Sequence, residues 1–296
     1  MPHMLFSARV MLCATVAVTA LPWSPATAGN GEWQLAYSFL CDAWDIAVDS
    51  QHNVYVMDED RIRVFTPEGQ FLREKTGLNY ARAIAIDEND VLYFLWYLHD
   101  RSNRLGRVQR YDLDFQPLGA WTYAQSDLQM GFAIDVRDGI AYIGAANGLL
   151  KFTADGAPLD TFEGGDWRSV QIIPDGSVWV ACDPGDGLVR HYSSNGVVLD
   201  EWSTTLPGDI SSGATDIAVD SNQRVFVADG NAVLLKIFRS NGKLEEAIQI
   251  WPFSVALDGD DVLYVGASYP MQLMKFVHAP VAVQATTWGG IKGLFH

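Results

Sequence analysis

The sequence predicts an all-β fold, a six-bladed β-propeller whose blades are four-stranded antiparallel sheets. The first observation is the stretch 44–72, where short apolar runs alternate with turns rich in Asp, Asn, Pro and Gly. That alternation is typical of an antiparallel meander of four short strands. The second observation is that the stretch recurs along the chain. One such sheet leaves both faces open to water, whereas a repeated sheet can bury them against its neighbours.

The repeat is best followed at one apolar position of its first strand. That position is occupied by Val48, Ile86, Val136, Ile172, Val219 and Leu257. The steps between these residues are 38, 50, 36, 47 and 38, a mean of about 42, which is the spacing of propeller blades. The longest step contains an insertion at 96–107 and a predicted loop at 121–130. In the third copy Arg137 stands where most of the other copies carry Asp, so its first turn must close differently.

The recurring pattern I-A-V-D, then V-Y-V, then R-I-x-V-F-x-x-x-G resembles the NHL repeat. The resemblance covers nearly all of 44–276 and is best in 46–69 and 217–242. It implies a closed propeller in which the first strand of each copy lines a central channel. A closed ring needs a strand from one terminus to complete a blade begun by the other. We expect WQLAYSF (33–39) to be the outer strand of the sixth blade, with VAVQATTW (281–288) as the alternative.

The first 28 residues have the pattern of a signal peptide. Arg9 precedes the apolar run VMLCATVAVTALPW, and Ala26-Thr27-Ala28 is a typical cleavage site. The sequence therefore predicts a mature propeller at 29–296 that is exported, periplasmic or secreted, with no membrane insertion after cleavage. The alternative is an uncleaved anchor.

The net charge bears on which molecules the protein can bind, and the repeat bears on whether its cysteines can pair. The chain has 20 basic and 36 acidic residues, a net charge of −16, which disfavours nucleic acid as a partner. The six-bladed arrangement puts Cys41 and Cys182 about half a turn apart, so we expect both to keep their thiols.

Residues just before the inner strands should meet at one mouth of the channel. They would form a ring of Trp44, Arg82, Phe132, Arg168 and Phe253. Guanidinium groups bind carboxylates and phosphates in a bidentate manner, and aromatic faces hold apolar groups. The ring therefore predicts a site for a small anionic ligand, or for a peptide or protein partner. The alternative is that the aromatic side chains fill the channel and the arginines neutralise Asp45 and Asp216.

Other aromatic and basic residues have two interpretations. The insertion at 96–107 contains Trp96, Tyr97, His99, Arg101, Arg104 and Arg107, and is long enough to be a lid, a partner contact or a solvated loop. Trp121, Tyr123 and Trp202 either join the same rim or pack between blades. The recurring Asp49, Asp87, Asp220 and Asp258 are interpreted as structural, because an Asp after a strand accepts hydrogen bonds from turn amides.

The catalytic alternatives depend on metal ligands. The peptide-amidating lyases resemble this repeat and need histidines that converge on zinc, but here the histidines scatter over the predicted fold. Lactonase-type six-bladed hydrolases hold a channel calcium, and Asp45 and Asp216 are the only acidic residues at the matching positions. We therefore expect a non-catalytic binding module without a cofactor. The alternative is a calcium-dependent hydrolase or lyase with Asp45 and Asp216 as metal ligands.

Overall fold

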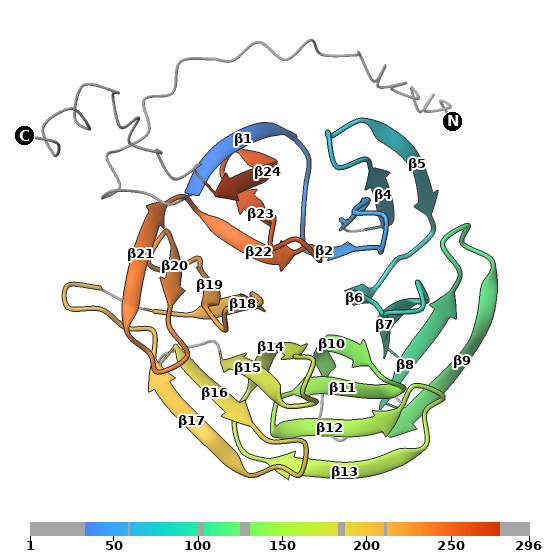
Figure 1. Ribbon diagram of the computed structural model, residues 1–296. Helices are drawn as coiled ribbons and strands as arrows, with labels where there is room; N and C mark the ends of the chain where they lie inside the picture. The colour runs from blue at the N-terminus through green and yellow to red at the C-terminus, as the bar shows by residue number, and fades with distance from the viewer. Residues whose placement is uncertain are drawn as a thin grey trace, which may run out of the picture.

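The computed structural model describes residues 33–58, 60–99, 104–124, 131–182, 187–209 and 212–278. These residues form six four-stranded antiparallel sheets arranged as a ring (Figure 1). The inner strands of the ring surround a central channel. The predicted all-β, six-bladed propeller is confirmed. The predicted signal peptide at 1–28 and the segment 281–288 lie outside the described residues. Within the described part of the chain, no helix is long and apolar enough to span a membrane.

Each blade consists of strands in chain order, from the channel to the outside. Blade one contains β2 (Asp45–Val48), β3 (Val54–Met57), β4 (Arg61–Phe65) and β5 (Phe71–Thr76); blade two contains β6 (Ala81–Ile86), β7 (Leu92–His99), β8 (Arg104–Tyr111) and β9 (Pro117–Ala124). Blade three contains β10 (Gly131–Arg137), β11 (Ile140–Ala145), β12 (Gly148–Thr153) and β13 (Pro158–Glu163); blade four contains β14 (Trp167–Ile172), β15 (Val178–Cys182), β16 (Leu188–Tyr192) and β17 (Val198–Ser203). Blade five contains β18 (Ala214–Val219), β19 (Val225–Asp229), β20 (Leu234–Phe238) and β21 (Leu244–Gln249); blade six contains β22 (Pro252–Leu257), β23 (Leu263–Ser268) and β24 (Met271–His278).

The ring closes at blade six, as predicted, with a strand from the N-terminal side. β1 (Trp33–Leu40) pairs with β24 as the outermost strand (Figure 1). The ring of Trp33 packs edge-on against Phe226 of blade five, with centroids 5.3 Å apart. On the channel side, Ser254 Oγ of blade six donates to the carbonyl of Ala43, 2.9 Å away, just before blade one. The closure is therefore fixed at both the outer and the inner end of the blade.

The blades are held together by side chains that fill the space between neighbouring sheets. Trp121 of blade two packs on Phe152 of blade three at 4.9 Å, and Tyr123 lies 5.6 Å from the same ring. Trp202 of blade four packs on Phe238 of blade five at 4.6 Å. Of the two interpretations left open for these three aromatics, packing between blades is the one that the structure supports.

The turn after each inner strand is closed mainly by aspartate, as predicted. Asp49 Oδ1 accepts hydrogen bonds from the backbone amides of Gln51 (2.9 Å) and Asn53 (2.8 Å). Asp87, Asp220 and Asp258 accept two turn amides in the same way. Blade three differs, also as predicted. Its turn consists of Asp138 and Gly139, both with positive φ (49° and 73°), the conformation of a tight two-residue hairpin.

The insertion at 96–107 is mostly not a loop, which corrects the prediction. It extends β7 and β8, whose ladder continues from Trp96 opposite Arg107 to His99 opposite Arg104. Residues 121–124 likewise belong to β9. The residues at the two ends of an insertion can continue an existing ladder, which the sequence pattern alone does not reveal. Cys41 and Cys182 form no disulfide, as predicted.

Candidate functional site

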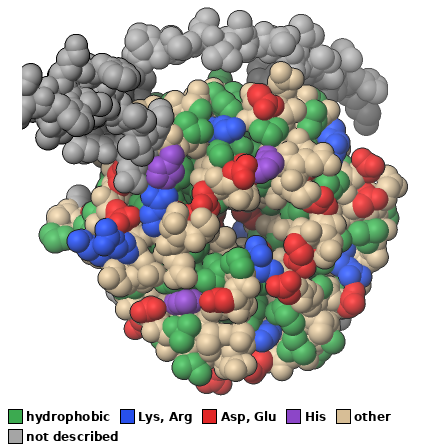
Figure 2. Space-filling view, in the orientation of Figure 1, with side chains coloured by type: hydrophobic (Ala, Val, Ile, Leu, Met, Phe, Trp, Pro, Cys, Tyr) green, Lys and Arg blue, Asp and Glu red, His purple; other side chains and the backbone are tan. Residues whose placement is uncertain are grey.

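The six inner strands enclose a channel with a volume of about 670 Å³. The opening at its centre is visible on the face of the molecule shown in Figure 2. The inner strands are β2, β6, β10, β14, β18 and β22, and each contributes one side of the wall. The wall therefore gathers residues that are far apart in the sequence.

A β-bulge recurs near the start of the inner strands of blades two to six. The ladder with the second strand skips one residue each time, always the second residue of the inner strand: Arg82, Phe132, Arg168, Thr215 and Phe253. A bulge leaves one extra residue outside the ladder and redirects its side chain. Trp44, just before β2, holds the equivalent position in blade one, and its backbone amide donates to Met57 O at 2.8 Å.

These six residues all line the channel, and we call them the mouth ring. Five of them are the ligand-site residues predicted from the sequence, and Thr215 completes the set. The prediction that they precede the inner strands is wrong for all but Trp44, because the bulge keeps each one inside its strand while turning its side chain out of the ladder. A single sequence offers no signal for such a bulge.

The mouth ring has aromatic faces and two guanidinium groups within reach of solvent. Trp44 and Phe253 are 41% and 44% exposed. The guanidinium of Arg168 stacks on the Phe132 ring, with its central carbon 3.7 Å from the ring centroid, and Nη2 donates to Asp166 at 2.8 Å. Arg82 is exposed. Stacking and the ion pair fix the orientation of Arg168, so the ring presents at least one pre-positioned cation.

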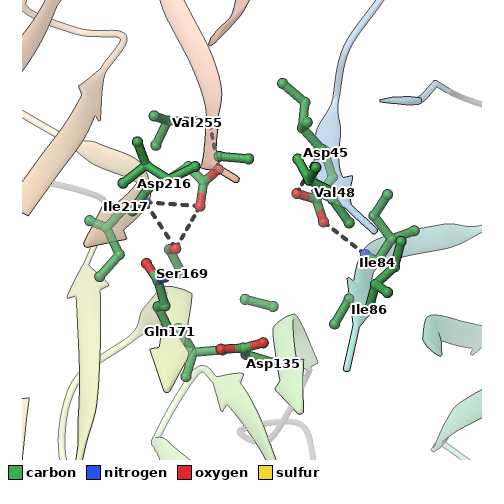
Figure 3. Close-up of a pocket in the computed structure, with 18 of the residues that line it drawn as sticks. Asp45, Val48, Ile84, Ile86, Asp135, Ser169, Gln171, Asp216, Ile217 and Val255 are labelled. Carbon is green, nitrogen blue, oxygen red and sulfur yellow. Dashed lines mark hydrogen bonds between the residues drawn. The ribbon is translucent and has the colours of Figure 1, made fainter. Parts of the chain in front are cut away.

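Below the mouth ring, three aspartates face the channel from alternate blades. Figure 3 shows Asp45 and Asp216 on opposite sides of the opening, with Asp135 between them along the wall. Each carboxylate accepts the amide of the following residue with one oxygen and an amide of the next blade with the other. The bonds between blades are Asp45 Oδ2 from Ile84 N (2.8 Å), Asp135 Oδ2 from Ile172 N (2.6 Å) and Asp216 Oδ2 from Val255 N (2.8 Å).

Polar side chains of blade four complete this layer. Ser169 Oγ donates to Asp216 Oδ1 at 2.6 Å and accepts from the amide of Ile217 at 3.0 Å. Gln171 Oε1 accepts from the amide of Val219 at 2.6 Å. The channel wall thus joins blade four to blade five by side-chain hydrogen bonds, in addition to the three aspartate bridges.

The environment of the three carboxyls favours their protonated form. Burial raises the pKa of both Asp135 and Asp216 to about 6, although the amides that they accept act in the opposite direction. Burial, and next the charge of Asp216, raise the pKa of Asp45 well above its ordinary value. Asp135 and Asp216 can therefore exchange protons near pH 6, the property expected of an acid or base in a cavity.

Sequence reasoning missed part of this wall. It identified Asp45 and Asp216 because they occupy one aligned position, whereas Asp135 lies two residues further along its strand. The alternative had the mouth arginines neutralising Asp45 and Asp216. The hydrogen bonds of these two carboxyls come instead from backbone amides and, for Asp216, also from Ser169. Because side chains alternate between the two faces of a strand, a residue two positions further along β10 also faces the channel, and Asp135 does so.

The wall does not match the ligand set of a calcium ion. Calcium takes six to eight oxygen ligands. Both oxygens of Asp45 and of Asp216 already accept backbone amides. The described residues contain no group of three or more His, Cys, Asp or Glu side chains arranged to hold a metal. The residues present at the predicted position thus do not fit a calcium centre.

Comparisons with known proteins support the architecture alone. No protein-family model matches the chain, and no curated protein matches it. The relation to the NHL repeat therefore remains a resemblance of pattern.

Several solved structures share the fold. A gluconolactonase from Xanthomonas campestris has a TM-score of 0.62 at 17% identity, covering 82% of this chain and 86% of that chain. A virginiamycin B lyase from Staphylococcus aureus has a TM-score of 0.64 at 12% identity, covering 84% and 100%. The WD40 propeller domain of Doa1 has a TM-score of 0.57 at 16% identity, covering 83% and 97%. Two of these are enzymes and one is a WD40 domain, so the shared fold leaves the function open.

Proposed function

We propose that the protein is a binding propeller that takes a small anionic molecule at the mouth ring. The observation that carries this proposal is the repeated bulge, which turns one side chain of every inner strand from blade two to blade six into the channel mouth. Two of these side chains are arginines. A chain with a net charge of −16 repels anions on average, so cations gathered at one cavity are a local exception.

The geometry of Arg168 supports binding rather than mere neutralisation. Its guanidinium is stacked on Phe132 and anchored by Asp166, so less side-chain freedom is lost when a ligand binds. Arg82, two blades away on the same ring, is exposed and adds a second positive charge. Trp44 and Phe253, in blades one and six, provide apolar contact area on the same ring. This set suits an anionic group joined to an apolar group.

The test uses 2-naphthoate as the probe and its uncharged analogue 2-naphthamide as the matched compound, followed by tryptophan fluorescence and calorimetry. The proposal predicts that naphthoate binds more tightly than naphthamide. Arg82→Gln should weaken naphthoate binding about tenfold or more, because a hydrogen bond to a charged group contributes roughly 1.5–3 kcal/mol. The control is Arg239→Gln, a largely exposed arginine of the turn after β20 that pairs with Glu245. Equal binding of the two compounds, or equal loss in both variants, would overturn the proposal.

A hydrolase or lyase is the second candidate. The raised pKa values of the channel carboxyls favour it, since they place proton exchange near pH 6 inside a cavity. Thermal unfolding of residues 29–296 with and without EDTA, with calcium then added back, tests the metal-dependent form. A loss of stability that calcium restores would support it and would show that the amide bonds of Asp45 and Asp216 give way to the ion. An unchanged melting temperature would count against a tightly bound metal.

A further inference from the structure

Large apolar side chains are exposed together where blade six meets blade one. We call this surface the rim patch: Leu40, Trp44, Trp251, Phe253, Tyr269 and Met271. Leu40 and Tyr269 are 79% and 80% exposed, and the other four lie between 41% and 56%. An isolated exposed apolar residue needs no explanation, but large apolar side chains exposed together on one surface are typical of interaction sites.

The topology shows that these residues share one end of the sheet. β1 ends at Leu40, β22 begins directly after Trp251, and the turn from β23 to β24 contains Tyr269 and leads into Met271. Hydrogen bonds join these segments: the amide of Ser268 donates to Trp251 O at 2.9 Å, and the amide of Cys41 donates to Met271 O at 3.2 Å.

The rim patch is continuous with the mouth ring. Trp44 and Phe253 belong to both, and the bond from Ser254 Oγ to Ala43 O ties the two strand starts together. Around the mouth ring, blades two, three and four contribute Arg82, Phe132 and the stacked Arg168. Blades five, six and one contribute Thr215, Phe253 and Trp44.

The part of the channel next to the mouth ring is a poor place for an apolar chain. Immediately below the mouth ring its wall carries the carboxyls of Asp45, Asp135 and Asp216, with Ser169 and Gln171 beside them. An alkyl chain that lies against hydrogen-bonded polar groups gains little of the free energy of apolar burial. Breaking the hydrogen bonds of those groups to make room for the chain is unfavourable. The apolar part of a ligand held at the mouth therefore gains more by lying outward, on the rim patch.

We propose that the occupant of the rim patch is the alkyl chain of an anionic amphiphile, a monocarboxylate whose head group lies at Arg82 and Arg168. This inference rests on the proposed function and specifies its ligand class. Charge selects the head, since the cations lie in blades two and four of the mouth ring, and the exposed apolar side chains where blade six meets blade one select the tail. A protein segment with apolar side chains would use the same surface without depending on chain length.

The experiment measures the affinity of butanoate, hexanoate, octanoate and decanoate by calorimetry and by tryptophan fluorescence, below the concentrations at which they form micelles. Affinity should rise about fourfold for each added methylene group, the increase expected for burial of one methylene. The double variant Trp251→Ser, Tyr269→Ser should flatten this increase and leave butanoate binding unchanged. The matched control is Leu159→Ser on the outer strand of blade three, where the side chain is half-exposed. It should leave the whole series unchanged.

Each outcome separates this inference from the proposed function. If affinity depends on Arg82 but not on chain length, the mouth binds anions and the amphiphile is wrong. If the chain-length dependence survives in the double variant, or is reduced equally by Leu159→Ser, the tail lies elsewhere and the inference is also wrong. If no carboxylate binds, both proposals fall. Near-ultraviolet circular dichroism and thermal unfolding establish that each variant is folded before its affinity is compared.

Discussion

Asp135 provides a sharp test of the electrostatics of the channel wall. Its carboxyl lies in the wall, and burial raises its pKa from 3.8 to about 6. A group whose pKa is higher in the folded protein than in the unfolded chain holds its proton more tightly when folded. Its contribution to stability is therefore greatest below pH 3.8, falls as the pH rises through 6, and is constant above that.

The size of the effect follows from the two pKa values. Between pH 4.5 and pH 7.5 the folded protein should lose about 2 kcal/mol of unfolding free energy through Asp135 alone. Asp135→Asn removes the titration, so the variant should lose about 2 kcal/mol less than the wild type over the same interval. The variant also loses one acceptor for the amides of Val136 and Ile172, which lowers its stability at every pH and cancels in the comparison.

The assay is urea unfolding at the two pH values, combined with a carbon-13 titration of the aspartate carboxyls. The control is Asp114→Asn, an exposed turn residue, which should change the unfolding free energy equally at both pH values. A signal assigned to Asp135 that titrates at or below pH 4 would refute the reasoning. So would a pH dependence that Asp135→Asn leaves intact.

Two further predictions concern the contacts that hold the ring together. Lys236 is fully buried, and its Nζ donates to Asp229 (2.7 Å) and Asp209 (2.6 Å). Lys236→Met should therefore lower the unfolding free energy, measured with urea, by about 3–5 kcal/mol, because it leaves two carboxylates without their cation. The control Lys243→Met, at an exposed lysine, should lower it by under about 0.5 kcal/mol. Trp33→Ala should cost about 3–5 kcal/mol because it opens a cavity beside Phe226 at the closure. Leu35→Ala, at a half-exposed residue of the same strand, should cost far less, and equal costs would contradict this account of the closure.

The blades could be predicted from sequence because each one repeats the same local physics. Alternating apolar runs define the strands, and an Asp such as Asp49 closes the following turn through its own side chain. The closing strand at 33–39 was predictable because a ring leaves one position open. The departure at Arg137 correctly indicated a different turn, although the tight hairpin at Asp138-Gly139 is a detail that only the structure provides.

The site was predictable only in part. Repeat alignment located the residues of the mouth ring, but the bulges that direct their side chains depend on pairing with the neighbouring strand. The roles of Asp135 and of the buried Lys236 depend on contacts between blades. Such contacts join residues 27 to 39 positions apart, as for Lys236 with Asp209 and Asp45 with Ile84, and leave no local pattern.

The most direct test of the central proposal is to observe the arginine side chains while a ligand binds. The protein is labelled with nitrogen-15 at arginine, and the guanidinium signals are followed by NMR during a titration with 2-naphthoate. The proposal predicts that the signals of Arg82 and Arg168 shift together and saturate with one affinity, while that of the exposed Arg239 stays in place. Signals of Arg82 and Arg168 that do not move, or an Arg239 signal that moves as far, would contradict a ligand site at the mouth ring.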